Sequence, residues 1–277
     1  MKVLLLVMDE QRVLLDRLYD IIRQHCDDCV IMRLTKAQQM NLGPVNHQDF
    51  DRVVVFSRVK RLAPQWRVLK CVPGLIFLEH DAYQNYMPNS KYRHMYSRLY
   101  ARLPACRALV SGAVVAQRMQ TEGIDALFIS KGYDDAMLHN LGRARDIPLG
   151  FLGSLKSKEY AQRRAILESL ASKTGMLIAK TASGEEYLQT LNRIKVFVSA
   201  DIGMGEFMIK NFEALACGCV LLAWSQGEED RLLGFEDMHN VVFYRSEAET
   251  TTASRGWDGI WQRRSRHRCV AGKRPGR

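Results

Sequence analysis

Short apolar runs alternate with amphipathic stretches along almost the whole chain, and this alternation restricts the possible folds more than any other feature. The runs have the length of single strands, and helical stretches lie between most of them. Repeated units of this kind predict parallel sheets covered by helices on both faces. The expected strands are Val3–Met8, Cys29–Leu34, Arg52–Ser57, Gly74–Glu79, Ala108–Ser111, Leu127–Ser130, Ile147–Leu152, Met176–Lys180, Val196–Ala200, Cys219–Trp224 and Asn240–Tyr244. The expected helices are Gln11–Gln24, Ser90–Leu103, Ala113–Glu122, Ser157–Lys173, Ser183–Ile194, Glu206–Cys217 and Glu228–Leu233.

The alternation pauses in a polar stretch with a glycine at residues 133–148, which we expect to be a linker between two domains. Residues 1–132 predict one Rossmann-like domain, and residues 149–249 predict a second. We therefore expect an α/β fold of two Rossmann-like domains whose parallel sheets face a central cleft, a usual place for a ligand. The final residues, 250–277, have no helical or strand period, and we expect a basic, irregular and disordered tail.

A net charge of +10 is typical of a nucleic-acid binder when the charge is spread over the whole chain, but here it is concentrated at one end. Residues 250–277 carry eight Lys and Arg against one Asp, which leaves the rest of the chain only mildly basic. Nucleic acid is therefore not an expected partner. The abrupt change of composition at residue 250 has two interpretations. It is either a solvated tail that binds polyanions or, as we favour, an altered or truncated reading frame that replaced native C-terminal helices.

No apolar run is long enough to cross a bilayer. The first run is followed directly by Asp9 and Glu10 without a small-residue cleavage site, so it predicts a strand rather than a signal peptide. Cys26 and Cys29 have CxxC spacing, but no second pair and no suitably spaced histidine pair accompanies them. We expect a cytoplasmic protein with reduced structural thiols and no metal site.

The segment Lys210–Gly218 and the apolar run that follows it are the most informative part of the chain for function. They predict a helix that presents Glu213, ends at a glycine and leads directly into a buried strand. This order places Glu213 beside the carboxyl edge of a parallel sheet, where open α/β folds bind ligands. Its apolar neighbours favour a buried functional carboxylate over an ordinary glutamate on a helix surface.

Residues from about 74 to 249 resemble a GT-B glycosyltransferase, of the glycosyltransferase family 4-like branch related to the spore-maturation CgeB type. The resemblance rests on the order and spacing of several segments along the chain. These segments are Phe77–Asp81, Ser130–Asp134, Leu149–Ser154, Lys210–Gly218 and Glu236–Tyr244. It implies transfer of a sugar from a nucleotide-diphosphate-sugar donor, usually with retention and without a tightly bound cofactor. The donor would bind the second domain and the acceptor the first.

The resemblance also implies roles for two glutamates. Glu213 would accept hydrogen bonds from the ribose hydroxyls of the donor nucleotide, a task that suits a carboxylate. Glu206 would lie near the donor sugar as a catalytic residue, although its spacing to Glu213 is one residue shorter than in the family. Phe207 also replaces the glycine that is customary in the family. Alternatively, Glu206 is a glutamate in the first turn of a helix, where its charge interacts favourably with the helix dipole.

Several further residues are candidates for binding the donor diphosphate. Lys210 would neutralise it and act in catalysis, or would only pair with Glu213 one helical turn away. Backbone amides at the helix start, including those of Gly205 and Phe207, would cradle a phosphate. Gly153 would let the backbone approach the phosphates at the end of a strand. Lys180 follows a strand, and Arg163 or Arg164 would supply a further cation.

Residues Glu79-His80-Asp81 end an expected strand of the first domain. His80 would bind the sugar or act near the acceptor hydroxyl, and a histidine with a purely structural role at the edge of a loop is an equal alternative. Tyrosines alternate with basic residues from Tyr83 to Arg102. This stretch would contact an anionic, lipid-linked acceptor at a membrane surface, or it is an ordinary amphipathic helix, which we favour.

The function that these features predict is transfer of a sugar to a glycan or lipid-linked acceptor, as in synthesis of cell-surface polysaccharide or lipopolysaccharide. The protein would be cytoplasmic, with possible peripheral contact with an anionic membrane at its inner face. One alternative is a GT-B nucleotide-sugar epimerase. Another is a remnant that binds a nucleotide sugar without turnover, which the composition of residues 250–277 favours. The first expected strand is not followed by glycine, which argues against a dinucleotide-binding enzyme.

Overall fold

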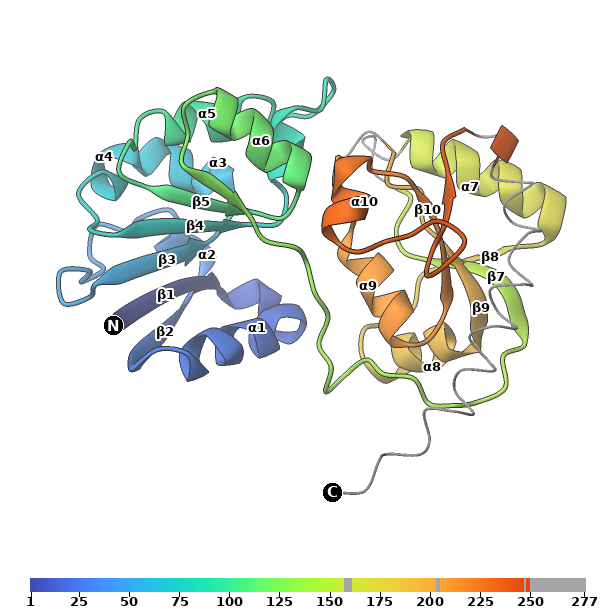
Figure 1. The fold of residues 1–277 in the computed structure, drawn as a ribbon. Helices are drawn as coiled ribbons and strands as arrows, with labels where there is room; N and C mark the ends of the chain where they lie inside the picture. Colours follow the sequence, from blue (N-terminus) through green and yellow to red (C-terminus); the bar gives the residue numbers. More distant parts are fainter. Residues whose placement is uncertain (157–160, 203–204, 247, 250–277) are drawn as a thin grey trace. The chain divides into compact units, whose positions relative to one another are not determined.

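The computed structural model describes residues 1–156, 161–202, 205–246 and 248–249. The chain forms two compact units. Met1–Asp134 and Gly203–Glu206 make up the first, and Asp135–Ile202 with the chain from Phe207 onward makes up the second. Each unit contains one parallel sheet with helices packed on it (Figure 1), so the α/β fold class predicted from the alternation is confirmed.

The first unit contains a six-stranded parallel sheet in the order β2-β1-β3-β4-β5-β6. Strand β1 lies between β2 and β3, with Leu5 opposite Ile31 on one side and Val54 on the other. Its strands are β1 Lys2–Met8, β2 Asp28–Leu34, β3 Arg52–Phe56, β4 Leu75–Glu79, β5 Arg107–Val110 and β6 Ala126–Phe128. Its α-helices are α1 Arg12–Gln24, α2 Lys36–Gln39, α3 Val59–Leu62, α4 Trp66–Leu69, α5 Met95–Tyr100 and α6 Ala113–Thr121. Short 3-10 turns are η1 Asp9–Gln11, η2 Ala63–Gln65 and η3 Ala82–Asn85.

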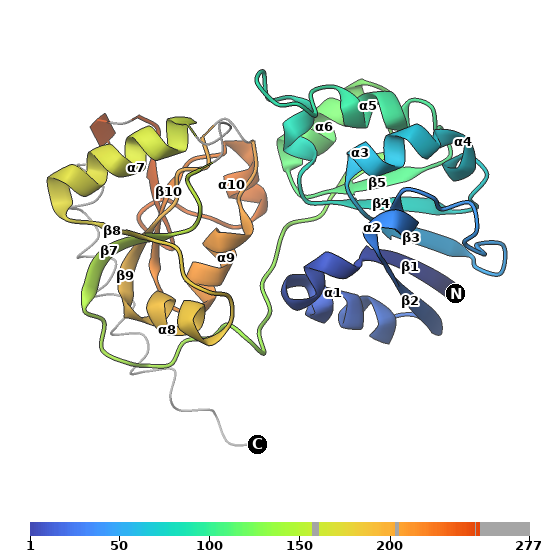
Figure 2. The ribbon, with the colours of Figure 1, turned by 180° about the vertical axis from the view of Figure 1, so that it is seen from behind.

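The central strands of this sheet are apolar on both faces because helices cover both. Figures 1 and 2 show α1 on one side of the sheet and α3, α4 and α5 on the other. Leu15 and Tyr19 of α1 pack with Leu5, Phe56 and Leu78 from three strands. Continuous apolar strands of this kind are typical of parallel sheets buried on both faces.

The second unit contains a five-stranded parallel sheet in the order β11-β10-β9-β7-β8. Leu149 of β7 lies opposite Val196 of β9, and Phe151 lies opposite Ile178 of β8. The strands are β7 Ile147–Leu152, β8 Leu177–Ala179, β9 Ile194–Val198, β10 Val220–Trp224 and β11 Val242–Tyr244. The helices are α7 Ala161–Thr174, α8 Glu185–Arg193, α9 Ile209–Ala216 and α10 Glu228–Leu232.

Strand order reverses beside the first strand of each sheet. In the first unit the chain passes from β1 outward to β2 and then returns to β3 on the other side. In the second it passes from β7 to β8 and returns to β9. Loops leave such a reversal point in opposite directions at the carboxyl ends of the strands, and the gap between them is where open α/β sheets bind ligands.

Helix α9 ends as the sequence predicts. Gly218 adopts the left-handed conformation, with φ of +83°. Its amide donates to the carbonyl of Leu215 at 2.9 Å, and the amide of Cys219 donates to that of Ala214 at 2.9 Å. These two bonds form a Schellman motif, which satisfies the last carbonyls of the helix and turns the chain directly into β10.

Two expected helices are wrong in extent. Within the stretch 90–103 only α5 is helical, because His94 adopts a left-handed φ of 58° and Asn85 caps the helix by accepting from the amides of Tyr96 and Ser97. Helix α9 begins at Ile209 rather than at Glu206. Met208 before it is extended, and its amide donates to Asp201 at 3.1 Å.

Three expectations fall wholly or partly outside the described residues. The disordered tail at 250–277 and the start of the helix expected from Ser157 both lie there, as does Met204 in the expected phosphate cradle. Across the part of the chain that the structure describes, no helix is both long and apolar enough to cross a membrane.

Arg145 anchors the stretch that precedes β7 to the second unit. Its guanidinium is only 8% exposed and donates to the carbonyls of Leu191 and Ile194 at 3.0 and 2.6 Å, and also to the carbonyl of Cys217. These carbonyls lie at the C-terminal ends of α8 and α9, where a cation offsets the negative end of the helix dipole.

We predict that Arg145→Ala destabilises the second unit by about 2–3 kcal/mol, because three buried carbonyls lose a charged donor. Chemical denaturation monitored by circular dichroism measures the change. Arg143→Ala is the matched control, since Arg143 is exposed and donates to Gln189 at the surface. Equal stability of the two variants would contradict the capping role.

Candidate functional site

The second unit gathers polar side chains at its reversal point. Gly153 follows β7 directly, Tyr187 lies in the first turn of α8, and Lys210 and Glu213 lie on α9. A Cβ atom on Gly153 would lie 3.0 Å from Cε of Lys210, and Nζ of Lys210 lies 5.0 Å from the centre of the Tyr187 ring. Four residues that are far apart in sequence therefore meet at the edge of this sheet. We name Gly153, Tyr187, Lys210 and Glu213 the donor cluster.

Glu213 is the carboxylate of the donor cluster and is only 6% exposed. Its Oε2 accepts a hydrogen bond of 2.7 Å from the Tyr187 hydroxyl. Burial raises the pKa of Glu213, while the Tyr187 hydrogen bond and the charge of Lys210 act in the opposite direction. Burial likewise raises the pKa of the Tyr187 hydroxyl, which is further raised by Glu213, so that Tyr187 remains a donor.

Lys210 is the cation of the donor cluster. Burial lowers its pKa, and Arg163 adds to that effect, whereas Glu213 and Asp201 favour the charged form. Its side chain lies over the Tyr187 ring, an arrangement in which the ring face attracts the ammonium group. A partly desolvated ammonium of this kind interacts more strongly with an anionic ligand than one in bulk water.

Gly153 is required by close packing in the donor cluster. A side chain at this position would meet Lys210 and also Phe151, whose Cζ would lie 3.0 Å from the added Cβ. Both distances are shorter than ordinary van der Waals contacts. A glycine therefore leaves room for the Lys210 side chain and keeps the backbone accessible at the end of β7.

Arg163 is held in a buried network. Its Nη2 pairs with Oδ1 of Asp201 at 2.5 Å, and its Nε donates to the carbonyl of Ala200 at 3.3 Å. Oδ2 of Asp201 also accepts from Ser199 and from Nδ2 of Asn211. This network ties α7 to the loop after β9 and to α9. The charges of Arg163 and Asp201 both act on Lys210, so this network lies close to the donor cluster.

The expected phosphate cradle at the start of α9 is corrected by the structure. The amide of Phe207 donates to Oε1 of the buried Glu229 at 2.9 Å, and Met208 is bonded to Asp201. Phe207 itself is buried, with its ring edge-on to Phe235. These amides are bonded within the protein because the chain before α9 is extended rather than helical.

Gly205 and Glu206 belong to the first unit. Glu206 is fully buried, and its carboxylate pairs with Nζ of Lys131 at 2.5 Å and accepts from the Ser111 hydroxyl at 3.0 Å. A Cβ on Gly112 would lie 2.7 Å from Oε2 of Glu206, so this glycine makes room for the carboxylate. The structure thus describes Glu206 through its partners within the first unit, Lys131 and Ser111.

Lys180, the remaining candidate on the second unit, is exposed directly after β8. It lies at the carboxyl end of its strand, as expected. The structure thus brings together Gly153, Lys210 and Glu213 from the predicted set. It adds Tyr187 to this set. The only indication of Tyr187 in the sequence was its position near the start of a helix that follows a strand.

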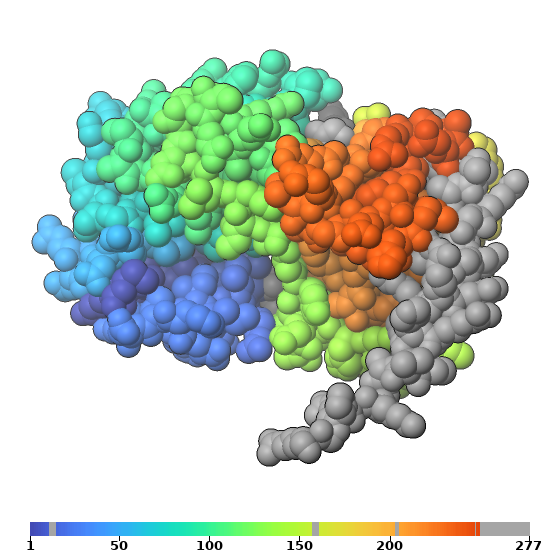
Figure 3. Space-filling view, viewed as in Figure 1, coloured from blue at the N-terminus to red at the C-terminus, as the bar shows by residue number. Residues whose placement is uncertain are grey.

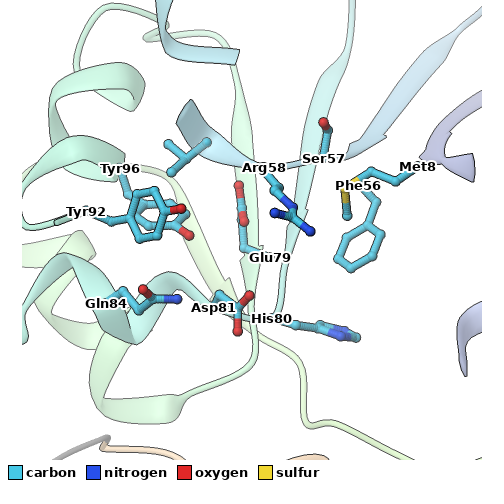
Figure 4. Close-up of a pocket in the computed structure, with 11 residues that line it drawn as sticks. Met8, Phe56, Ser57, Arg58, Glu79, His80, Asp81, Gln84, Tyr92 and Tyr96 are labelled. Carbon is cyan, nitrogen blue, oxygen red and sulfur yellow. The ribbon is translucent and has the colours of Figure 1, made fainter. Parts of the chain in front are cut away.

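The first unit has a pocket of about 170 Å³ at its own reversal point. Its walls come from the carboxyl ends of β1, β3 and β4 and from the turns that precede α5 (Figure 4). The lining residues are Met8, Phe56, Ser57, Arg58, Val59, Glu79, His80, Asp81, Gln84, Tyr92 and Tyr96. Ser57 is fixed by donating to Gln39, a fully buried residue. We name this cavity the first-unit pocket.

Glu79 is the most buried acid of the first-unit pocket, at 4% exposure. Its Oε1 accepts a hydrogen bond of 2.8 Å from the Tyr100 hydroxyl. Burial, opposed by the Tyr100 hydrogen bond and assisted by the nearby Asp81, raises the pKa of Glu79 to about 8. The carboxyl is therefore mostly neutral at neutral pH.

His80 has a different environment from its neighbour Glu79. Its ring packs edge-on against Phe56, with 5.2 Å between ring centres. Burial, with a contribution from Lys131, lowers the pKa of His80 to about 4, so the imidazole is neutral. The structure places His80 in the pocket wall beside Glu79, which the sequence named with it without a role, and bonds Glu79 to Tyr100. The signal for Glu79 was a carboxylate at the end of an otherwise apolar strand.

The described residues contain no group of three or more His, Cys, Asp or Glu side chains arranged to hold a metal ion.

Residues 135–265 match the model of a glycosyl transferase-like family. The match covers the second unit, including the donor cluster, and extends beyond the last described residue. No curated protein matches the chain.

Solved structures with a similar fold extend over nearly the whole chain. Anabaena Alr3699/HepE in complex with UDP and glucose is 13% identical with a TM-score of 0.65, covering 94% of this chain and 91% of that chain. Sucrose-phosphate synthase from Thermosynechococcus elongatus is 11% identical with a TM-score of 0.62 and covers 94% and 91%. The DNA-modifying β-glucosyltransferase, studied with and without uridine diphosphoglucose, is 10% identical with a TM-score of 0.57 and covers 95% and 91%. This likeness shows the GT-B fold, as the sequence predicts.

The buried carboxyl of Glu79 makes the stability of the first unit depend on pH. Its raised pKa means that stability falls as pH rises from the ordinary glutamate value toward about 8. We predict that Glu79→Gln removes this loss. The variant should exceed the unaltered protein in stability by more than about 1 kcal/mol near pH 8.5, and by much less near pH 5.

Calorimetric unfolding at the two pH values measures this difference. Glu122→Gln is the control, since Glu122 is exposed at the end of α6. The same change in stability with pH for Glu79→Gln as for the unaltered protein would contradict the buried, neutral state of Glu79.

Proposed function

We propose that this protein is a glycosyltransferase that moves a sugar from a nucleotide-diphosphate-sugar donor to a hydroxyl group of a glycan or lipid-linked acceptor. The observation that carries the proposal is the donor cluster. It combines a buried carboxylate, a partly desolvated ammonium and a glycine at the reversal point of the second sheet. The cluster lies inside the region that matches the glycosyl transferase-like family.

Each member of the donor cluster has a role in this proposal. Glu213 accepts hydrogen bonds from the ribose hydroxyls, with Tyr187 fixing its orientation. Lys210 stabilises the diphosphate as it leaves, which lowers the barrier because the charge on the leaving group grows in the transition state. Gly153 lets the diphosphate approach the backbone beside Lys210. Lys180 is a further candidate cation, whereas Arg163 supports the cluster through Asp201.

We infer that the donor is a uridine diphosphate sugar. Anabaena HepE was solved with UDP and with UDP-glucose, and the DNA-modifying enzyme uses uridine diphosphoglucose as its substrate. Membership of the CgeB-type branch and retention of the anomeric configuration rest on the sequence motifs. A product anomer opposite to that of the donor would exclude retention.

The acceptor side of the proposal rests on the first unit. Residues 58–107 carry ten Lys and Arg against two carboxylates. Six of these cations are exposed on or beside α4 and α5, which lie on the same side of the sheet (Figure 1). They are Arg67, Lys70, Lys91, Arg93, Arg98 and Arg102. Figure 3 shows the region of α5 and α6 at the surface of this unit. A surface of this charge favours an anionic lipid-linked acceptor and peripheral contact with the inner face of a membrane.

We predict that Glu213→Ala weakens UDP binding at least about ten-fold, because two ribose hydroxyls lose their acceptor. Lys210→Ala should weaken binding of UDP more than binding of uridine, since it removes a charge that only the diphosphate meets. Isothermal titration calorimetry measures both. Parallel titrations with GDP, dTDP and CMP report which base the site prefers.

Matched controls lie on α7, where Glu168 and Lys173 are exposed. Glu168→Ala and Lys173→Ala should bind UDP as the unaltered protein does. Unchanged UDP affinity in Glu213→Ala, or no nucleotide binding by the unaltered protein, would overturn the donor assignment. Nucleotide-sugar binding without transfer would favour the binding-protein alternative, and conversion of donor alone to its epimer would favour the epimerase.

The membrane contact has its own test. Replacing Arg93, Arg98 and Arg102 by Glu should abolish cosedimentation with vesicles that contain phosphatidylglycerol, because the surface changes sign. Binding to vesicles of neutral phosphatidylcholine should be weak for both proteins. Equal cosedimentation of the two proteins with anionic vesicles would remove the membrane from the proposal.

A further inference from the structure

The first-unit pocket contains a buried carboxyl with one oxygen still available. Tyr100 is the only hydrogen-bond partner of the Glu79 side chain among the described residues, and it bonds to Oε1. Oε2 is bonded to no protein group there, and Glu79 lines the pocket. The cavity volume of about 170 Å³ far exceeds the roughly 15 Å³ that a single water requires. The space therefore fits a ligand larger than water.

The side chains around Glu79 are suited to hydroxyl groups. Gln84, Tyr92 and Tyr96 offer amide and phenol groups that both donate and accept hydrogen bonds. Figure 4 shows these residues and Arg58 arranged around the space beside Glu79. Met8 and Phe56 supply an apolar wall. This mixture of polar donors, polar acceptors and an apolar surface matches a sugar ring, which has hydroxyls at its edge and carbon-bound hydrogens on its faces.

The charges at the pocket oppose an anionic ligand. Asp81 lies in the wall beside the neutral carboxyl of Glu79, and Arg58 is the one Lys or Arg among the lining residues. Arg58 is about half exposed and lies 4.0 Å from the carboxylate of Glu10. An entering phosphate or carboxylate would meet Asp81 with only this shared cation to offset it. An uncharged ligand meets no such penalty.

We propose that Glu79, oriented by Tyr100, determines which ligand the first-unit pocket accepts, and that this ligand is an uncharged hydroxyl-bearing group such as one neutral hexose unit. The inference rests on the proposed function, in which this hexose is the part of the acceptor that the first unit recognises. Glu79 acts here as a specificity-determining residue. Tyr100 is a positioning residue, because it acts through Glu79.

The protonation state of Glu79 supports this role. Burial raises its pKa to about 8, so near neutral pH the free oxygen carries a proton and donates it to a ligand hydroxyl. Above that pH the carboxyl becomes an anion that cannot donate. The titratable and charged groups around it are Arg58, His80, Asp81, Tyr92, Tyr96, Tyr100 and, beside His80, Lys131.

Two substitutions at Glu79 separate hydrogen bonding from shape. Glu79→Gln keeps an acceptor for Tyr100 and a donor for the ligand, whereas Glu79→Leu fills similar space with neither. The probes are the methyl glycosides of glucose, galactose, mannose and N-acetylglucosamine, titrated calorimetrically into the full chain. Methyl glucuronide and glucose 6-phosphate are the anionic probes. Glu122→Leu is the matched control on the surface.

We expect at least one neutral glycoside to bind, and Glu79→Leu to weaken it at least about ten-fold. Glu79→Gln should bind within about three-fold of the unaltered protein near pH 7. Affinity should fall above about pH 8 in the unaltered protein but not in Glu79→Gln. Both anionic probes should bind more weakly than the neutral one, and Glu122→Leu should bind normally.

The inference is overturned if no neutral glycoside binds, if Glu79→Leu binds as well as the unaltered protein, or if an anionic probe binds at least as tightly. Titration of UDP into the same samples keeps this result separate from the proposed function. Normal UDP affinity in Glu79→Leu shows that the second unit is folded, and calorimetric unfolding of the same variant reports whether the first unit, which contains Glu79, is folded. Failure of the glycosides with UDP binding intact would remove the pocket assignment alone, whereas failure of UDP would remove the donor site.

Discussion

The reversal of strand order beside β1 and beside β7 is the constraint on which both candidate sites depend. At each reversal the loops on the two sides diverge, and backbone packing leaves a space at the carboxyl ends of the strands. The first-unit pocket occupies one such position, and the donor cluster occupies the other. Side chains from distant parts of the sequence meet there only because parallel strands bring all their carboxyl ends to one edge.

Each reversal point holds a buried glutamate oriented by a tyrosine. Glu79 is bonded to Tyr100 and Glu213 to Tyr187, at 2.8 and 2.7 Å. Burial raises the pKa of both carboxyls, and the difference between them lies in their neighbours. Lys210 favours the charged form of Glu213, whereas Asp81 opposes the charged form of Glu79. Two similar pairs thereby differ in the charge that surrounds the carboxyl.

Two residues that are candidate site residues in the sequence, Arg163 and Glu206, lie in buried polar networks. Arg163 bonds to Asp201, and Glu206 bonds to Lys131 and Ser111. A buried charge without a partner destabilises the folded protein. Each of these charged side chains can therefore remain in the interior because it is paired. Their pairing holds α7, α9 and the loop after β6 in place.

Local patterns in the sequence determined the strands, the parallel α/β class, the end of α9 at Gly218 and the position of Glu213 on α9. Apolar periodicity and glycine conformation act over only a few residues, which is why the sequence shows them. Tertiary structure alone decided the start of α9, the pairing of Glu206 within the first unit and the hydrogen bond of Tyr100 to Glu79. These outcomes depend on contacts such as Asp201 with Met208 or Tyr100 with Glu79. The hydrogen bonds that satisfy a buried polar group come from whichever elements the fold brings beside it, and no local pattern records them.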